Sequence, residues 1–168
     1  MAGTESPVPT IAELEEQESR LEFTHFDNLD AWNLGVRLVG LATERALPVA
    51  IDIRRHGQQL FHAALPGTTP ENDAWIERKI RVVDRFAAAS LLVRLRLAES
   101  GQALDAGLGV DPAQYAAHGG CVPLRIRGVG VVGTVTVSGL PQVQDHALVV
   151  EALEGALAAA TGTHRPEE

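Results

Sequence analysis

The sequence predicts an α/β domain of the α+β type, in which helices cover an antiparallel sheet. Two pairs of β-branched, apolar segments are each joined by a short turn that contains glycine, and such turns produce antiparallel hairpins. Segments with apolar residues at helical spacing precede, separate and follow these pairs. The resulting order is helix, hairpin, two helices, hairpin, helix, which differs from the strand and helix alternation that builds a parallel sheet.

Length and composition indicate one soluble, intracellular domain. A chain of 168 residues with 45% hydrophobic residues is long enough to bury a single core. Its apolar runs are far shorter than the roughly 20 residues that cross a bilayer, so we expect no membrane association. The acidic N-terminal region does not resemble a targeting segment, and the single cysteine, Cys121, is typical of a reducing compartment. We therefore expect a cytoplasmic protein.

The charge of the chain argues against a nucleic-acid partner. The formal net charge is -8, whereas binding to a phosphate backbone needs a clustered positive surface. Six of the fourteen basic residues nevertheless lie in one segment. We interpret this segment as a solvated or interface face, because no aromatic platform accompanies its cations. Its members are Arg78, Lys79, Arg81, Arg85, Arg94 and Arg96.

The two ends of the chain carry no predicted site. Residues 1–20 are predicted to be a mobile or weakly helical segment, because residues 13–22 have helical composition but few apolar anchors. The folded domain is predicted over residues 21–161, followed by a mobile tail over residues 162–168.

The first strong helix is predicted over residues 27–46, with Asp27 as its N-cap and Pro48 beyond its end. A wide stripe of apolar residues predicts that this helix is buried against the sheet. The stripe consists of Leu29, Trp32, Leu34, Val36, Leu38, Val39 and Leu41.

Two strands follow this helix as a hairpin. Apolar residues alternate with others over residues 49–53, as in a half-buried strand. The segment from Arg55 to Gly57 forms the turn, and residues 59–63 return as the second strand.

The middle of the chain is predicted to be helical and then irregular. Thr69 suits an N-cap position, and the following helix is expected to bend or break near Phe86 and to stop at Gly101. Residues 107–120 are predicted to be a loop, with a short helical turn over residues 112–115.

The second hairpin is predicted from strands over residues 122–126 and 129–138, and Pro123 requires an edge or a bulge there. A final helix follows over residues 141–160. The glycines of residues 128–133 match G-x-G-x-x-G, but they precede a strand, whereas a dinucleotide fingerprint opens a helix. No other established catalytic motif is present.

The start of the last helix is the first candidate ligand site. Ser138 and Gly139 precede a helix N-terminus, whose free amides and partial positive charge suit a carboxylate or phosphate. The alternative is that Ser138 or Gly139 serves only as an N-cap. Asp145 and His146 follow, and as neighbours they point about 100° apart on a helix, so they do not act as a pair. His146 is either a partly buried structural histidine or a candidate general acid or base.

A second candidate lies just before the third predicted strand. Gly119 and Gly120 allow the backbone to approach a ligand or another chain closely, and the alternative is a kinked start of the strand. His118 and Cys121 flank this pair as candidate ligands of iron or haem, with His62 as a third. His118 is also a candidate general acid or base.

An aromatic residue beside two cations forms the third candidate. Trp75, Arg78 and Lys79 fall close together on a predicted helix and match a propionate or a phosphate. The alternative is that Trp75 belongs to the core.

Two long runs of the sequence, residues 48–86 and 115–153, closely resemble an uncharacterised family of the haem-degrading, HbpS-like superfamily. That superfamily also includes GlcG-like proteins and the C-terminal domain of PduO-type corrinoid adenosyltransferases, and the resemblance covers about residues 21–160. It rests on Gly119, Gly120 and Pro123 in a Gly-Gly-x-x-Pro motif, on the strand that ends in Ser138 and Gly139, and on Asp145.

The resemblance implies a profilin-like fold, an antiparallel sheet of four to five strands with helices on both faces. It also implies a homo-oligomer built from dimers. Some members of the superfamily bind or degrade haem or respond to iron, so haem is a candidate cofactor. The haem contacts of those members do not map onto a motif of this sequence, and we transfer no axial ligand.

These observations favour a cytosolic, oligomeric binding protein for a small anionic ligand, with haem or another tetrapyrrole as one candidate. The site is expected where the glycine pair meets the start of the last helix, with Arg78 and Lys79 as partners of acidic groups. One alternative is an enzyme acting on a small metabolite, with His118 or His146 as general acid or base. The other is a structural or adaptor protein, since a fold alone does not settle a function.

Overall fold

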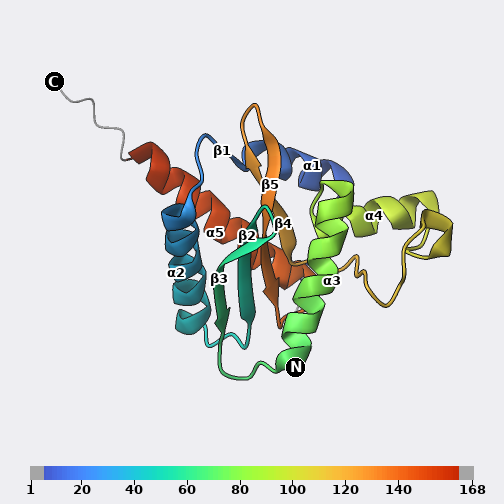
Figure 1. Cartoon of the computed structure of the whole chain (residues 1–168), viewed down its shortest axis with the longest axis horizontal. Helices are drawn as coiled ribbons and strands as arrows, with labels where there is room; N and C mark the ends of the chain where they lie inside the picture. Colours follow the sequence, from blue (N-terminus) through green and yellow to red (C-terminus); the bar gives the residue numbers. More distant parts are fainter. Residues whose placement is uncertain (1–5, 163–168) are drawn as a thin grey trace.

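A five-stranded sheet in the order β1-β4-β5-β2-β3 forms the centre of the molecule (Figure 1). The structure is a computed structural model that describes residues 6–162, so parts of the predicted mobile segments 1–20 and 162–168, namely residues 1–5 and 163–168, lie outside the described residues. The strands are β1 Glu22–Phe23, β2 Ala50–Arg55, β3 Gln58–Ala64, β4 Cys121–Ile126 and β5 Gly130–Ser138. The helices are α1 Ile11–Arg20, α2 Asn28–Glu44, α3 Pro70–Phe86, α4 Ser90–Ser100 and α5 Gln142–Gly162, with a 3₁₀ turn at Ala106–Leu108.

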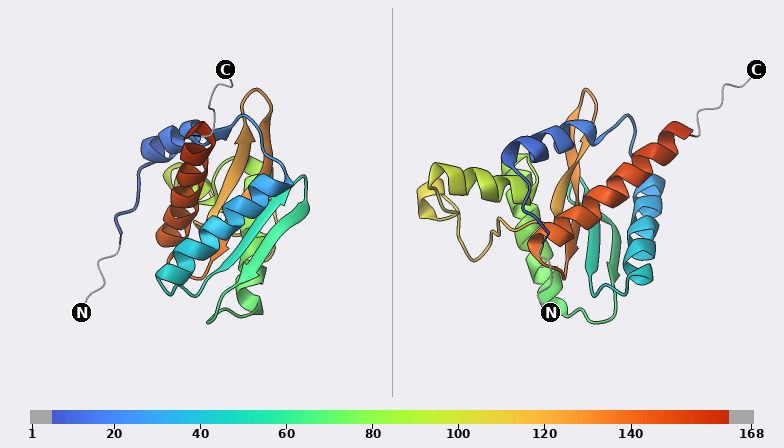
Figure 2. Two further views of the ribbon diagram at one scale, coloured as in Figure 1. Left: turned by 90° about the vertical axis from the view of Figure 1, so that its left-hand side faces the viewer. Right: turned by 180° about the vertical axis from the view of Figure 1, so that it is seen from behind.

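Helices cover both faces of this sheet, as the sequence predicts. α2 and α5 lie together on one face, and α3 crosses the other, while α1 and α4 pack beside β4 (Figure 2). The main hydrophobic core therefore lies between the sheet and the α2 and α5 layer, and a smaller apolar cluster lies under α3. Within residues 6–162, no helix combines the length and the apolar character that crossing a membrane requires.

Both predicted hairpins are confirmed, since β2 pairs antiparallel with β3 and β4 pairs antiparallel with β5. The β2–β3 turn uses His56 and Gly57 at φ angles of 49° and 78°, the positive values that a tight hairpin turn needs. Pro123 is paired only with β5, because β1 reaches β4 no further than Arg125. The short strand β1 pairs parallel with β4 and was not predicted, since two residues carry no periodic signal.

The predicted burial of the α2 stripe is correct for one side only. Leu34 and Leu38 are 1% and 0% exposed, but Leu29, Trp32 and Val36 are 65%, 57% and 50% exposed. A straight helix presents only part of its surface to a sheet, so a stripe this wide cannot be buried completely by one layer. Gly35 marks the buried side, because a Cβ atom there would lie 2.3 Å from the Phe61 ring.

The long helical region divides at the predicted place. Ala87 takes a left-handed conformation with φ 51° and ends α3, and α4 begins at Ser90. At residues 112–115 the expected helical turn is instead a hydrogen-bonded turn after Asp111, whose carboxylate accepts from the amide of Ala113.

The basic segment from Arg78 to Arg96 fixes the loop that follows α4. Three arginines of this segment donate hydrogen bonds to backbone carbonyls of the loop, so they stabilise irregular chain in addition to facing solvent. Arg85 donates to Leu108, Arg81 to Gln114 and Arg94 to Ala117.

Helix α1 is a well-built part of the domain. Thr10 and Glu13 form a reciprocal capping box at its start, which satisfies amides that would otherwise lack partners. Leu14 is 1% exposed, and the Glu18 carboxylate accepts from the amide of Ala89 and from Arg125. α1 therefore packs on α4 of the same chain, whereas the sequence predicted only a mobile or weakly helical segment there.

A buried histidine joins α1 to α5 and gives the fold a pH dependence. His146 is 3% exposed, its Nε2 lies 2.7 Å from Oε1 of Gln17, and burial lowers its pKa from 6.5 to about 4. The unfolded chain, with the ordinary pKa, takes up a proton first as the pH falls below about 6.5. The free energy of unfolding therefore falls between about pH 6.5 and 4.

We predict that this loss reaches about 3 kcal/mol at most, as the size of the shift implies. Urea unfolding of the parent and of His146→Gln at several pH values between 4 and 7 measures it. The variant should show a flatter dependence of unfolding free energy on pH, and parallel curves for both proteins would contradict the prediction.

Candidate functional site

A cavity of about 220 Å³ lies where α3, the loop before β4 and the start of α5 meet. α3 contributes Asn72, Trp75 and Lys79 to its walls, and the loop contributes His118. The remaining wall is made by residues of the segment that leads from Ser138 into α5. Three segments that are distant in sequence therefore form one small site.

The two glycines bring the loop against α5. The amide of Gly119 donates to Oε1 of Gln142 at 3.1 Å, and a Cβ atom on Gly119 would lie 2.3 Å from the Gln142 carbonyl oxygen. Gly120, with φ 125°, leaves no room for a Cβ atom beside the Val137 carbonyl oxygen, which would be 2.5 Å away. The glycine pair thus lies against the start of α5, as the sequence suggested. Neither glycine lines the cavity, and their part is to let the loop that carries His118 approach α5 closely.

A buried ion pair forms the floor of the cavity. Nζ of Lys79 lies 3.0 Å from Oδ2 of Asp145 and donates to the Val137 carbonyl oxygen at 3.0 Å, and these two charged side chains are 4% and 2% exposed. Asp145 also accepts from the amides of Leu140, at 2.9 Å, and Gly139. Burial raises the pKa of Asp145 above its ordinary value, although Lys79 and these amides act in the opposite direction. Asp145, and not Ser138, therefore satisfies the amides that precede α5.

The outer wall of the cavity is aromatic, and a cation packs against it from outside the cavity. The rings of Trp75 and His118 meet edge to face with centroids 5.0 Å apart, and the Arg78 guanidinium lies 4.4 Å from the Trp75 ring centroid. Burial lowers the pKa of His118, and Arg94, Lys79 and Arg78 lower it further. His118 therefore presents a neutral imidazole at neutral pH, and among residues 6–162 neither ring nitrogen has a hydrogen-bond partner.

Most of the polar atoms in the cavity wall that have no hydrogen-bond partner among residues 6–162 are donors. Lys79 has three N–H bonds and uses two of them on Asp145 and Val137. The side-chain oxygens of Gln142 and Asn72 already accept from the amides of Gly119 and Thr69. An excess of donors over acceptors suits a ligand that carries oxygen acceptors, above all an anion.

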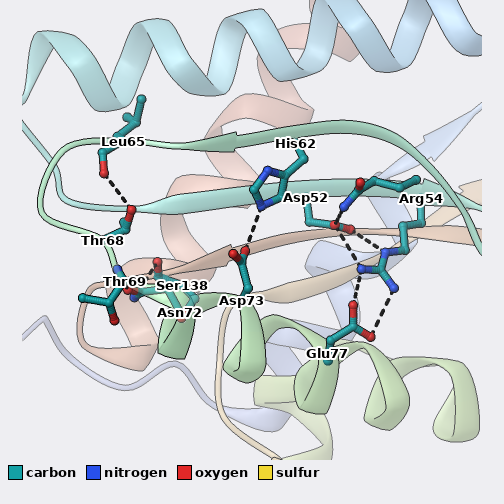
Figure 3. A network of polar contacts seen from close by, with 11 residues as sticks. Asp52, Arg54, His62, Leu65, Thr68, Thr69, Asn72, Asp73, Glu77 and Ser138 are labelled. Atoms are coloured by element: carbon teal, nitrogen blue, oxygen red, sulfur yellow. Dashed lines mark hydrogen bonds and ion pairs between the residues drawn. The ribbon is translucent and has the colours of Figure 1, made fainter.

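A separate polar network holds α3 on the sheet (Figure 3). His62 of β3 lies 2.8 Å from Asp73 of α3, and Arg54 of β2 bridges Asp52 and Glu77. His62 lines a different cavity, of about 200 Å³, which shares no residue with the cavity at His118. The structure therefore does not bring these two histidines together.

Two other predicted site residues also lie elsewhere. Cys121 is wholly buried beneath α3, burial raises the pKa of its thiol to about 12, and its sulfur accepts a hydrogen bond from Thr136. His146 points from α5 toward α1. Neither residue lines a described cavity, so the sulfur and this imidazole are not placed to meet a ligand of the His118 site.

The structure does place Trp75, Lys79, His118, Ser138 and Gly139 around one cavity. Arg78 lies behind Trp75 and not in the wall. Sequence reasoning missed Asn72 and Gln142. Both sit in the first turn of a helix, where polar side chains are ordinarily read as caps, and Asn72 does donate to the Ser138 carbonyl oxygen as well as capping α3.

One other group among residues 6–162 has the spacing of a metal site. His25, Asp27 and Asp30 bring a nitrogen and two carboxylate oxygens within 4.8 Å of one another. Both carboxylates already accept hydrogen bonds from amides at the start of α2, and His25 is exposed. The group is explained as the cap of α2.

We predict that the Lys79 and Asp145 pair is strongly coupled. Asp145→Leu should lower the free energy of unfolding by about 3–5 kcal/mol, because it leaves a buried ammonium without its partner. The double variant with Lys79→Met should lose much less than the sum of the two single losses. Urea unfolding of all four proteins measures the coupling.

The exposed pair of Arg45 and Glu151, with side chains 45% and 46% exposed, is the control. The same cycle on that pair should give a coupling of about 1 kcal/mol or less. Additive losses at Lys79 and Asp145 would contradict the prediction.

Comparisons with known proteins give a consistent family. The family model described as "Haem degrading protein HbpS-like" matches residues 26–154. The UPF0303 protein SCO2848 of Streptomyces coelicolor is 63% identical over 152 residues, which cover 90% of this chain and 96% of that protein.

Solved structures share the fold. The crystal structure of the Ybr137w protein matches with a TM-score of 0.82 at 31% identity, covering 90% of each chain. The crystal structure of a complex of PduOC with heme matches with a TM-score of 0.64 at 19% identity, covering 78% of this chain and 94% of that one. The second likeness concerns the fold alone.

Proposed function

Since this chain belongs to the HbpS-like family of haem-degrading proteins, we propose that it is an oligomeric, cytoplasmic binding protein for a small anionic ligand. The binding site is the cavity formed by α3, His118 and the start of α5. The single observation that carries the proposal is the surplus of hydrogen-bond donors in that cavity. The cytoplasmic location is supported by the lone, buried cysteine.

The electrostatics of the cavity favour an anion of modest charge. Lys79 is paired with Asp145, so the floor has no net charge, but its third N–H bond is free for a ligand oxygen. Trp75 and the neutral ring of His118 supply flat surfaces beside this donor. A carboxylate or a phosphate monoester can accept hydrogen bonds from the N–H donors of the cavity. A cation cannot accept them and would lie beside the Lys79 ammonium, so it matches the cavity less well.

Haem is the candidate that the family description and the haem complex of a structural relative support. His118 would be the residue that holds a haem iron, because its imidazole is neutral, partly exposed and without a hydrogen-bond partner among residues 6–162. The cavity of about 220 Å³ is smaller than the roughly 300–1,000 Å³ of pockets that enclose drug-sized ligands. It therefore suits a propionate group better than a whole macrocycle. A bound haem would supply redox and ligand-binding chemistry at its iron.

An enzyme that uses His118 as a general base is the second candidate function. The lowered pKa keeps this imidazole able to accept a proton at neutral pH, and it stands beside the donor Lys79 within one cavity. Turnover of a metabolite that disappears in His118→Gln, with the binding of that metabolite retained, would favour catalysis over binding.

We predict that haem titration gives a Soret band that depends on His118. His118→Ala should shift and weaken the band and raise the dissociation constant at least about tenfold, because it would remove the imidazole that holds the iron. His62→Ala is the matched control, since that histidine is also partly exposed but lines another cavity. Equal spectra for both variants, or a spectrum of free haem in the parent, would remove haem from the proposal.

The exposed part of α2 supports self-association. Leu29, Trp32 and Val36 form an apolar stripe on the surface, and the Trp32 ring meets Phe61 of β3 at a centroid distance of 5.7 Å. β3 is an edge strand, because β2 is the one strand within residues 6–162 that pairs with it. An apolar stripe that continues onto an open strand edge is typical of a protein interface.

We predict that Trp32→Asp shifts the oligomer toward smaller species, because it places a charge in the apolar stripe that copies of the chain would bury. Val129→Asp is the control, since Val129 is an equally exposed apolar residue in the β4–β5 turn. Light scattering after size exclusion measures the mass of both variants. An unchanged mass for Trp32→Asp would exclude this surface as the interface.

A further inference from the structure

We infer that the ligand is an amphipathic anion, whose acidic group enters the His118 cavity and whose apolar chain lies in a second compartment beside the N-terminal segment. This inference rests on the proposed function and names the class of ligand more closely. Three observations support it: a second cavity adjoins the first, the walls of the two cavities differ in chemistry, and the N-terminal segment beside the second cavity is held in place by local structure.

The second cavity adjoins the first one. Its volume is about 390 Å³, and it lies between residues 6–8 of the N-terminal segment and the first turn of α5. His118 and Gln142 line both cavities. Because these two side chains border both spaces, one ligand can extend from the inner cavity past them into the outer one.

The two cavities differ in chemistry. The inner one presents the donors of Lys79 and Gln142, whereas the outer one adds three apolar side chains, Val8, Pro141 and Val143, beside the uncharged polar residues Ser6 and Gln144. Val8 is 60% exposed, so most of its apolar surface is available to a ligand in the outer cavity. A ligand with an acidic end and an aliphatic chain would pair the donors and cover Val8 at the same time.

The N-terminal segment is not a free tail where it borders this compartment. Thr10 is fixed by its capping box with Glu13, and Pro7 and Pro9 restrict the backbone on both sides of Val8. Figure 2 shows this segment running beside the first turns of α5. Val8 is therefore held over the outer compartment by local structure and is placed to act as its cover.

The test uses acetate and hexanoate as probes, in a Trp32→Phe background that leaves Trp75 as the only tryptophan. Quenching of Trp75 fluorescence then reports occupation of the inner cavity. We expect hexanoate to bind at least roughly tenfold more tightly than acetate, because its additional methylene groups leave water. Val8→Asp should remove most of this gain and change the affinity for acetate by less than about twofold.

Val129→Asp provides the matched control, because it introduces the same charge at an exposed valine far from the cavity in sequence. It should leave both affinities unchanged. Equal affinities of the parent for acetate and hexanoate would overturn the inference and leave the proposed function standing. A chain-length gain that survives Val8→Asp would overturn the role of the N-terminal segment. Absence of saturable binding by either acid would overturn the proposed function together with the inference.

Discussion

The buried pairing of Lys79 with Asp145 is the interaction on which the site depends. It joins α3, the end of β5 and the start of α5, three elements that the chain reaches at very different points. Two charges in a nearly dry interior are unfavourable unless each finds its partner and further hydrogen bonds, and here the carbonyl of Val137 and the amides of Leu140 and Gly139 supply them. The geometry of these three elements is therefore specified by charge as well as by apolar packing.

The same pairing explains why the neighbouring backbone is built from glycine. Gly120 runs so close to Lys79 that a Cβ atom would lie 2.7 Å from the ammonium nitrogen. Gly119 lies equally close to the first residue of α5. Gly120 thus leaves room for the buried ion pair and Gly119 for the start of α5, and His118 reaches the cavity because it directly precedes these two glycines. A cavity lined by polar donors follows from this arrangement.

The basic residues have two different structural roles that sequence alone does not separate. Lys79 is neutralised in the interior, whereas Arg81, Arg85 and Arg94 hold the carbonyls of a long loop. Arg78 lies against Trp75 and lowers the pKa of His118 through its charge. The positive segment therefore stabilises the wall of the cavity and does not form one continuous charged face.

The sequence alone determined the helices, both hairpins, the break near Phe86 and the family, because periodicity, turn residues and motif spacing are local properties of the chain. It also singled out Trp75, Lys79, His118, Ser138 and Gly139. Only the tertiary structure decided which of these residues meet, since the distances between α3, the glycine pair and α5 arise from contacts remote in sequence. For the same reason, the burial of Cys121, the exposure of one side of α2 and the second cavity beside Val8 were not predictable, because each depends on what packs against the residue. Periodicity records only which face of an element is apolar, and for His146 it left a structural and a catalytic role open, of which the structure supports the structural one.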